Sequence, residues 1–191
     1  VHSRVIRETI QPAIAGMAAE GTPYTGFLYA GLMIDAAGNP KTLEFNCRLG
    51  DPETQPLMMR LKSDLVGLVE AALDRRLDRT KAEWDARPAL GVVMASAGYP
   101  GNYRKHDTIA GLAGPKPDLK PDLKPDLKVF HAGTALEAGK VVTTGGRVLC
   151  VCALGDSVAA AQKRAYEGVA AIRWEGVQYR KDIGYRAIAR R

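Results

Sequence analysis

Two strand-like segments joined by a tight turn constrain the fold of this chain more than any other feature. Phe27–Asp35, FLYAGLMID, is too apolar for a surface strand and too short for a typical helix, so we expect a buried strand. The following DAAGNP has the composition of a turn. Residues 41–45, KTLEF, should return as the second strand of a hairpin.

The second strand carries an unusual polar row. Alternation sends Glu44, Asn46 and Arg48 to one face. The intervening residues, expected on a core face, are Leu43, Phe45 and Cys47. Glu44 and Asn46 offer hard oxygens about 7 Å apart along the backbone, and two protein ligands suffice for Mg²⁺ when ATP phosphates supply others. Arg48 could bind phosphate or carboxylate with a planar fork. From the spacing alone, a merely solvated polar face is an equally open interpretation.

A Gly-Asp-Pro-Glu turn follows this row immediately. Gly50 permits a close backbone approach, and Asp51 and Glu53 add carboxylates. Asp51 or Thr54 could instead simply cap the next helix.

Helical spacing of apolar residues predicts two helices in the first part of the chain. One covers Arg4–Ala19, with an internal Pro12 that should bend or interrupt it. The other is predicted as a single long helix from Thr54 to about Leu77. Its apolar stripe consists of Leu57, Leu61, Leu65, Leu68 and Ala72.

The sequence pattern changes near residue 82, where we place a domain boundary. Short strand-like runs begin at Ala89, Lys128, Lys140 and Arg147, separated by turn residues. A helix is expected over Asp156–Ile172. Its apolar side comprises Val158, Ala161, Ala165, Val169 and Ile172. The chain is therefore expected to have an α+β fold.

One segment is of low complexity. Lys116–Leu127 consists of three copies of KPDL. Each proline fixes φ and removes a backbone donor, so we expect an exposed, extended loop at 116–127 without a functional role.

Composition limits the classes of function. The 191 residues are 46% hydrophobic and 25% charged, as in soluble globular proteins. No apolar run approaches the roughly 20 residues needed to cross a bilayer, so no membrane interaction is expected. Three cysteines without a CxxC pattern favour a reduced, cytoplasmic location.

The net charge of +6 is concentrated after Ser96. No recognised nucleic-acid motif accompanies it, so we expect no nucleic-acid partner.

Several stretches together resemble one enzyme family. GFLYAGLMID followed by PKTLEFNCRLGDPETQP resembles the C-terminal part of an ATP-grasp fold, in particular that of the phosphoribosylamine–glycine ligase family. LGVVMASAGYPGNY, VFHAGT, GGRVLCVCALG, AQKRAYEGV and RKDIGYRAI resemble that family's C-terminal domain, in the expected order. The resemblance covers nearly the whole chain except the KPDL repeat. It implies a C-terminal portion of an ATP-grasp fold at residues 1–81 and a small mixed α/β C-terminal domain at residues 82–191.

The resemblance also implies a reaction and a site. The family joins 5-phosphoribosylamine and glycine through glycyl phosphate, giving glycinamide ribonucleotide, ADP and phosphate in purine biosynthesis. Glu44 and Asn46 would hold Mg²⁺ or Mn²⁺ against ATP. Arg48 would act in catalysis and in binding the phosphoryl group or glycine. Gly50, Asp51 and Glu53 would shape the substrate site.

The family's nucleotide-covering lobe and N-terminal domain have no counterpart in these residues. We therefore expect a fragment that lacks N-terminal domains of the same enzyme and is inactive alone. Three alternatives stay open: another ATP-grasp ligase of purine synthesis, a non-catalytic module that binds metal or nucleotide, and a basic domain that binds nucleic acid.

Other residues are weaker candidates. Arg147, Arg180 and Lys181 could each reach a phosphate but are more often surface charges. His131 could be a buried hydrogen-bonded residue or a site residue. Cys47 is not expected to act as a nucleophile.

Overall fold

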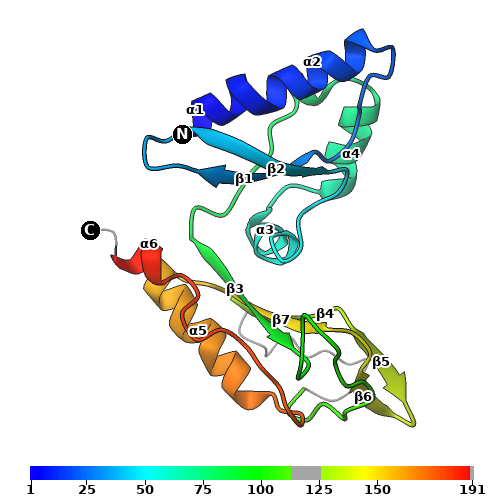
Figure 1. The fold of residues 1–191 in the computed structure, drawn as a ribbon, viewed down its shortest axis with the longest axis vertical. Helices are drawn as coiled ribbons and strands as arrows, with labels where there is room; N and C mark the ends of the chain where they lie inside the picture. The colour runs from blue at the N-terminus through cyan, green and yellow to red at the C-terminus, as the bar shows by residue number, and fades with distance from the viewer. Residues whose placement is uncertain (113–125, 190–191) are drawn as a thin grey trace. The chain divides into compact units, whose positions relative to one another are not determined.

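The structure, a computed structural model, describes residues 1–112 and 126–189 (Figure 1). The predicted loop at 116–127 lies outside the described residues except for its last two. The chain divides into two compact units, Val1–Asp51 with Ser63–Ala82, and Pro52–Lys62 with Glu83–Arg191. Helices and strands occur in both, which agrees with the expected α+β class. The domain boundary near residue 82 stays a prediction.

The first unit opens with a continuous helical run. It consists of α1 (His2–Val5), the π-helical segment η1 (Ile6–Ile10) and α2 (Gln11–Ala19). Pro12 lies in the first turn of α2, directly after the π-helical segment. The proline ring would clash with the carbonyl four residues earlier in a regular helix. A local change to π-helical hydrogen bonding is a way to relieve such a clash. The predicted helix is confirmed, and its hydrogen bonding changes from α-helical to π-helical just before Pro12.

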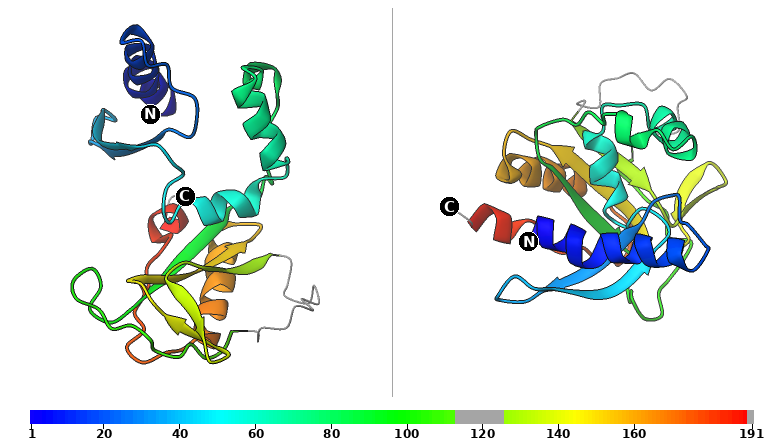
Figure 2. Two further views of the ribbon diagram at one scale, coloured as in Figure 1. Left: turned by 90° about the vertical axis from the view of Figure 1, so that its right-hand side faces the viewer. Right: turned by 90° about the horizontal axis from the view of Figure 1, so that it is seen from above.

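The predicted hairpin is also present in the first unit. Strand β1 (Tyr29–Ile34) pairs antiparallel with β2 (Pro40–Asn46). Asp35 fixes the turn by accepting hydrogen bonds from the backbone N–H groups of Ala37 and Asn39. Arg4 donates to the Asn39 side chain at 2.6 Å and joins the helix to this turn. Figure 2 shows the helical run beside the hairpin in its right-hand view.

The expected burial of the hairpin is wrong. Met33, Leu43 and Phe45 are 58%, 67% and 44% exposed, and Cys47 is exposed too. Within the described residues this sheet has only two strands, and a two-stranded sheet buries little apolar surface by itself. A register shift between Gly31 and Leu32 also breaks strict alternation along the pair.

The predicted long helix is wrong as well, because two separate helices form. Helix α3 (Thr54–Arg60) belongs to the second unit, and α4 (Leu65–Leu73) belongs to the first, followed by the 3₁₀ helix η2 (Leu77–Arg79). Leu61 leaves helical geometry with ψ of 121°. Asp64 then begins α4 by accepting hydrogen bonds from the N–H groups of Val66 and Gly67.

The second unit is built on a three-stranded antiparallel sheet. Its order is β3 (Ala89–Ala95), β7 (Arg147–Leu154), β4 (Leu127–His131). Helix α5 (Val158–Ala171) packs along one face (Figure 1), and Ser157 caps its N-terminus. This layer forms the core. Its central residues are Val92, Met94, Val151, Ala161, Ala165 and Val169. The predicted apolar side of this helix is therefore confirmed.

The opposite face of this sheet is covered differently. Helix α3 contacts both β3 and β7. A Cβ added to Gly91 would lie 3.2 Å from Cγ of Pro56 in α3 and about as close to the thiols of Cys150 and Cys152. A glycine here therefore lets the helix approach the sheet closely.

The remaining elements of the second unit are small. Strands β5 (Thr134–Glu137) and β6 (Lys140–Thr143) form a separate hairpin, and α6 (Tyr185–Ala189) ends the described chain. None of the helices in the described ranges combines the length and apolar character that a membrane crossing requires.

Candidate functional site

The polar row of the first unit forms a chain of side-chain contacts at the end of β2. Asn46 donates from Nδ2 to Oε1 of Glu44 at 3.0 Å. Arg48 donates to the Leu49 carbonyl at 2.9 Å and makes a long hydrogen bond of 3.5 Å to Oδ1 of Asn46. The three residues predicted to share a face therefore converge.

This arrangement fits a divalent cation. The Glu44 carboxylate and the Asn46 amide each carry hard oxygen donors, and the two groups meet, with Oε1 of Glu44 3.0 Å from Nδ2 of Asn46. An exchange of the amide oxygen and nitrogen by a flip of the Asn46 side chain would turn both oxygens toward a shared ion. No group of three or more His, Cys, Asp and Glu residues within 1–112 and 126–189 could hold a metal.

The Gly-Asp-Pro-Glu turn follows, but the division between the units falls inside it. Gly50 is buried and Asp51 is exposed, both in the first unit. Glu53 falls in the second unit and takes the N-cap position of α3 without a side-chain capping bond. The suggestion that Asp51 or Thr54 takes that position is thus wrong. The substrate roles of Gly50, Asp51 and Glu53 stay predictions.

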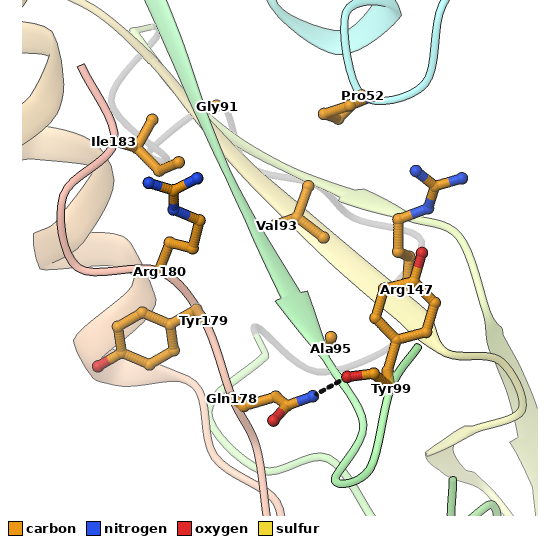
Figure 3. A pocket seen from close by; sticks show the side chains of 10 residues that line it. All are labelled: Pro52, Gly91, Val93, Ala95, Tyr99, Arg147, Gln178, Tyr179, Arg180 and Ile183. Carbon is orange, nitrogen blue, oxygen red and sulfur yellow. Dashed lines mark hydrogen bonds between the residues drawn. The ribbon is translucent and has the colours of Figure 1, made fainter. Parts of the chain in front are cut away.

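A cavity of about 530 Å³ lies in the second unit, on the sheet face that carries α3 (Figure 3). Gly91, Val93 and Ala95 of β3 form its floor. Strand alternation explains this, because Leu90, Val92 and Met94 point into the core on the other face. The walls contain Pro52, Tyr99 and Arg147 on one side, and Gln178, Tyr179, Arg180 and Ile183 on the other.

Two of the weaker sequence candidates meet at this cavity. Arg147 and Arg180 both line it, and Figure 3 shows them on opposite sides of β3 with Val93 between them. Sequence reasoning missed Tyr99 and Gln178. The alternation of residues 89–95 was a signal for the floor, but nothing in the sequence indicated which distant loops border it.

Hydrogen bonds fix the Tyr99 side of the cavity. Gln178 donates from Nε2 to the backbone carbonyls of Ser96 and Tyr99, at 3.0 and 2.9 Å. The buried Ser96 hydroxyl donates to the Gly145 carbonyl at 2.9 Å. A Cβ on Gly146 would lie only 2.2 Å from the Tyr99 ring, so glycine is required for the ring to pack there. This side of the cavity is therefore held in place by the fold.

The Arg180 side is fixed through an ion pair. Arg180 donates from Nε and Nη2 to both carboxylate oxygens of Asp182, at 2.9 and 2.6 Å. These hydrogen bonds raise the pKa of Arg180 and lower the pKa of Asp182. The Tyr166 hydroxyl of α5 donates to the Arg180 carbonyl at 2.7 Å. The carboxylate therefore orients the guanidinium and offsets part of its charge.

The structure places the remaining candidates elsewhere. His131 is exposed, and its Nδ1 lies 3.1 Å from the Thr134 hydroxyl, so the buried-histidine interpretation is wrong. Lys181 is exposed and does not line the cavity. Cys47 lies beside Tyr24. The pKa of Tyr24 is raised mainly by desolvation and, to a lesser extent, by its hydrogen bond with Cys47.

Comparison with known proteins matches both parts of the chain to one family. Residues 89–186 match the family described as phosphoribosylglycinamide synthetase, C domain. Residues 1–54 match phosphoribosylglycinamide synthetase, ATP-grasp (A) domain. The chain is 62% identical to a phosphoribosylamine–glycine ligase of Pseudomonas aeruginosa and 58% identical to one of Vibrio vulnificus, each over 190 residues. All of this chain is covered in both alignments, but only 43% of each relative.

Solved structures show the same fold. A phosphoribosylamine–glycine ligase from Thermotoga maritima is similar with a TM-score of 0.70 and 36% identity, over 93% of this chain and 41% of that one. The biotin carboxylase domain of a Hydrogenobacter thermophilus 2-oxoglutarate carboxylase is similar with a TM-score of 0.57 and 16% identity, over 85% of this chain and 34% of that chain. The second likeness concerns the fold alone.

Proposed function

Because this chain belongs to the phosphoribosylglycinamide synthetase family, we propose that it serves an ATP-dependent ligase that joins 5-phosphoribosylamine and glycine. The product would be glycinamide ribonucleotide, formed with ADP and phosphate, as a step of purine biosynthesis. The observation that carries the proposal is the match of residues 1–54 and 89–186, in order, to two domains of one family. The chain spans less than half of its curated relatives, so we propose that N-terminal domains of the same enzyme complete the nucleotide site.

We propose that Glu44 and Asn46 hold the divalent cation, Mg²⁺ or Mn²⁺, that accompanies ATP. Their hydrogen bond of 3.0 Å supports this assignment, since it shows that both side chains reach one point. When bound, such an ion neutralises polyphosphate charge and orients the γ-phosphoryl group. Arg48, whose guanidinium lies next in the row, would reduce the repulsion between the glycine carboxylate and the triphosphate, because a guanidinium can bind phosphate or carboxylate.

The proposed reaction has two steps. The glycine carboxylate attacks the γ-phosphorus, the bond to the β-phosphate oxygen breaks, and ADP leaves. The amine of phosphoribosylamine then attacks the carbonyl of glycyl phosphate, loses a proton and expels phosphate. Arg48 would offset the charge of the transferring phosphoryl group in the first step, and Gly50, Asp51 and Glu53 would shape the site for glycine and the amine.

We also propose a domain organisation and a cellular location. Residues 1–81 would complete the ATP-grasp domain, and residues 82–191 would form the C-terminal domain. The three free cysteines support a reduced, cytoplasmic location.

The test is a Glu44→Gln variant in the complete enzyme that contains this chain. ADP release dependent on glycine and phosphoribosylamine should fall about 100-fold or more, because an anionic metal ligand becomes neutral. The Mg²⁺ or Mn²⁺ concentration needed for half-maximal rate should rise. Glu70→Gln, which changes an exposed carboxylate of α4 in the same unit, is the matched control. Unchanged turnover and metal dependence in Glu44→Gln would refute the metal assignment, and ligation by residues 1–191 alone would refute the need for further domains.

A further inference from the structure

One wall of the cavity is a segment of irregular backbone between α5 and α6. It covers residues 178–183 and contributes four lining residues, Gln178, Tyr179, Arg180 and Ile183 (Figure 3). A segment outside helices and strands has no regular hydrogen bonds of its own, so its backbone groups must find partners on neighbouring elements. Those partners decide where the guanidinium of Arg180 stands.

A single hydroxyl of α5 holds both ends of the stretch 180–183. The Tyr166 hydroxyl donates to the Arg180 carbonyl at 2.7 Å and accepts from the Ile183 N–H at 3.2 Å. Between these two residues, the carboxylate of Asp182 accepts two hydrogen bonds from the Arg180 side chain. The hydroxyl therefore closes the stretch of backbone within which the ion pair forms.

The hydroxyl is itself fixed relative to the core. Tyr166 belongs to α5, and the adjacent Ala165 is buried against the sheet. Gln162, one turn earlier on the same face of the helix, donates from Nε2 to the Ile183 carbonyl at 2.7 Å. The ring of Tyr166 also packs at a tilt beside that of Tyr179, with 6.4 Å between the ring centroids. The helix thus supplies a rigid support for the cavity wall.

We infer that Tyr166 is a positioning residue of the ligase, which sets the place of the Arg180 guanidinium through the backbone of residues 180–183. This inference rests on the proposed function. Each of the three substrates carries an anionic group, and a guanidinium binds an anion well only when its planar fork is correctly oriented. Asp182 fixes that orientation relative to the segment, and Tyr166 fixes the segment relative to the core. Tyr166 does not line the cavity, so its effect is exerted through Arg180.

The test is a double-mutant cycle in the complete enzyme that contains this chain, with Tyr166→Phe and Arg180→Gln made singly and together. Phenylalanine keeps the ring and removes only the hydroxyl. ADP release gives kcat and the KM for each substrate. Arg180→Gln should raise one KM about tenfold or more, because charge-assisted hydrogen bonds are lost. Tyr166→Phe should raise the same KM about three- to tenfold, with kcat within about twofold. In the Arg180→Gln background, Tyr166→Phe should change that KM less than about twofold.

Ser157→Ala is the matched control for a loss of stability. Ser157 caps the same helix by accepting from the Ala160 N–H at 3.1 Å. Its removal should lower the urea midpoint about as much as Tyr166→Phe does, but should leave every KM within about twofold. Hydrogen exchange at the Ile183 amide reports the segment directly. It should be about tenfold faster in Tyr166→Phe than in Ser157→Ala, because only the former removes the acceptor of that N–H.

Three results would overturn the inference while ligase activity is present. They are no change of any KM in Arg180→Gln, additive effects of the two substitutions on KM, and a Tyr166→Phe enzyme that matches Ser157→Ala in every KM and in exchange at Ile183. A complete, unaltered enzyme without ADP release dependent on glycine and phosphoribosylamine would refute the proposed function itself, and the positioning role with it.

Discussion

Cys150 and Cys152 lie on the same face of β7 with their sulfur atoms 3.5 Å apart. They are 2% and 0% exposed. The hydrogen bond between the two thiols and, to a lesser extent, burial raise the pKa of the Cys152 thiol. Because the thiolate is the reactive species, both the raised pKa and the lack of access suppress chemistry at this pair. The pair therefore serves packing between the sheet and α3, where Gly91 leaves room for both sulfur atoms.

This protection can be measured with a thiol reagent. In the native chain we expect one fast-reacting thiol per molecule, that of the exposed Cys47. The other two should react only as the second unit unfolds in urea. Cys47→Ser should abolish the fast phase. Rapid reaction of two or three thiols in the native chain would contradict the burial of the pair.

At the scale of elements, one capping residue fixes the start of α4. Asp64 accepts hydrogen bonds from Val66 at 3.2 Å and from Gly67 at 3.1 Å. These satisfy two of the N–H groups that every helix leaves without a partner at its start. Asp64→Ala should lower the free energy of unfolding by about 1 kcal/mol, measured by urea denaturation. Asp64→Ser keeps a capping oxygen and should lose much less. An equal loss in both variants would show that the carboxylate acts in another way.

The break between α3 and α4 shows how far the sequence predicts the helices and strands. The stripe from Leu57 to Ala72 keeps helical spacing through Leu61 and Leu65, so periodicity alone favours one helix. Backbone hydrogen bonds to residues outside the helix end it near Leu61 instead. The Lys62 N–H donates to the Glu83 carbonyl, and the Asp85 N–H donates to the Arg60 carbonyl. Such contacts join residues more than 20 positions apart and leave no local pattern. The strands β3 and β7 and the helix α5, whose patterns agree with their packing, were predictable.

The two candidate sites also differ in how far the sequence predicts them. Glu44, Asn46 and Arg48 follow from strand alternation, because local geometry alone brings them together. The cavity required Arg147 and Arg180 to meet across a fold in which Gln178 pairs with Ala95. That pairing spans most of the second unit and is fixed by packing, so the sequence marked each arginine separately without indicating a shared space.

At the scale of the molecule, arginine–carboxylate pairs recur in both units. In the second unit, Arg87 binds Asp85 at 2.8 Å and Asp126 at 2.9 Å, and Arg164 of α5 also binds Asp126 at 3.2 Å. This network joins the segment before β3 to the start of β4 and to the helix. Elsewhere, hydrogen bonds from arginine lower the pKa of Glu8, Glu175 and Asp182, and one from Asn39 lowers that of Asp35.

These pairs predict how stability depends on pH. The hydrogen bonds from Arg87 hold the pKa of Asp85 well below its ordinary value of 3.8. The folded state therefore binds fewer protons than the unfolded state just below that value, and stability rises with pH there. The contribution of Asp85 is fully present above pH 3.8 or so and is lost as the pH falls toward the lowered pKa. The urea midpoint, followed by Trp174 fluorescence, should thus fall steeply below about pH 4, because the unfolded chain then binds a proton at Asp85 that the folded chain does not.

Asp85→Asn removes the titrating group and should make this decline shallower, besides lowering the midpoint at neutral pH. Asp78→Asn is a control from the other unit, because Asp78 lies in the first unit and forms a loose, exposed pair with Arg79 at 3.8 Å. Its pH profile should run parallel to that of the unaltered chain, as expected for an exposed ion pair that contributes little. If Asp85→Asn instead keeps the full steepness of the acid decline, the Asp85–Arg87 pair is not what links proton binding to the stability of the second unit.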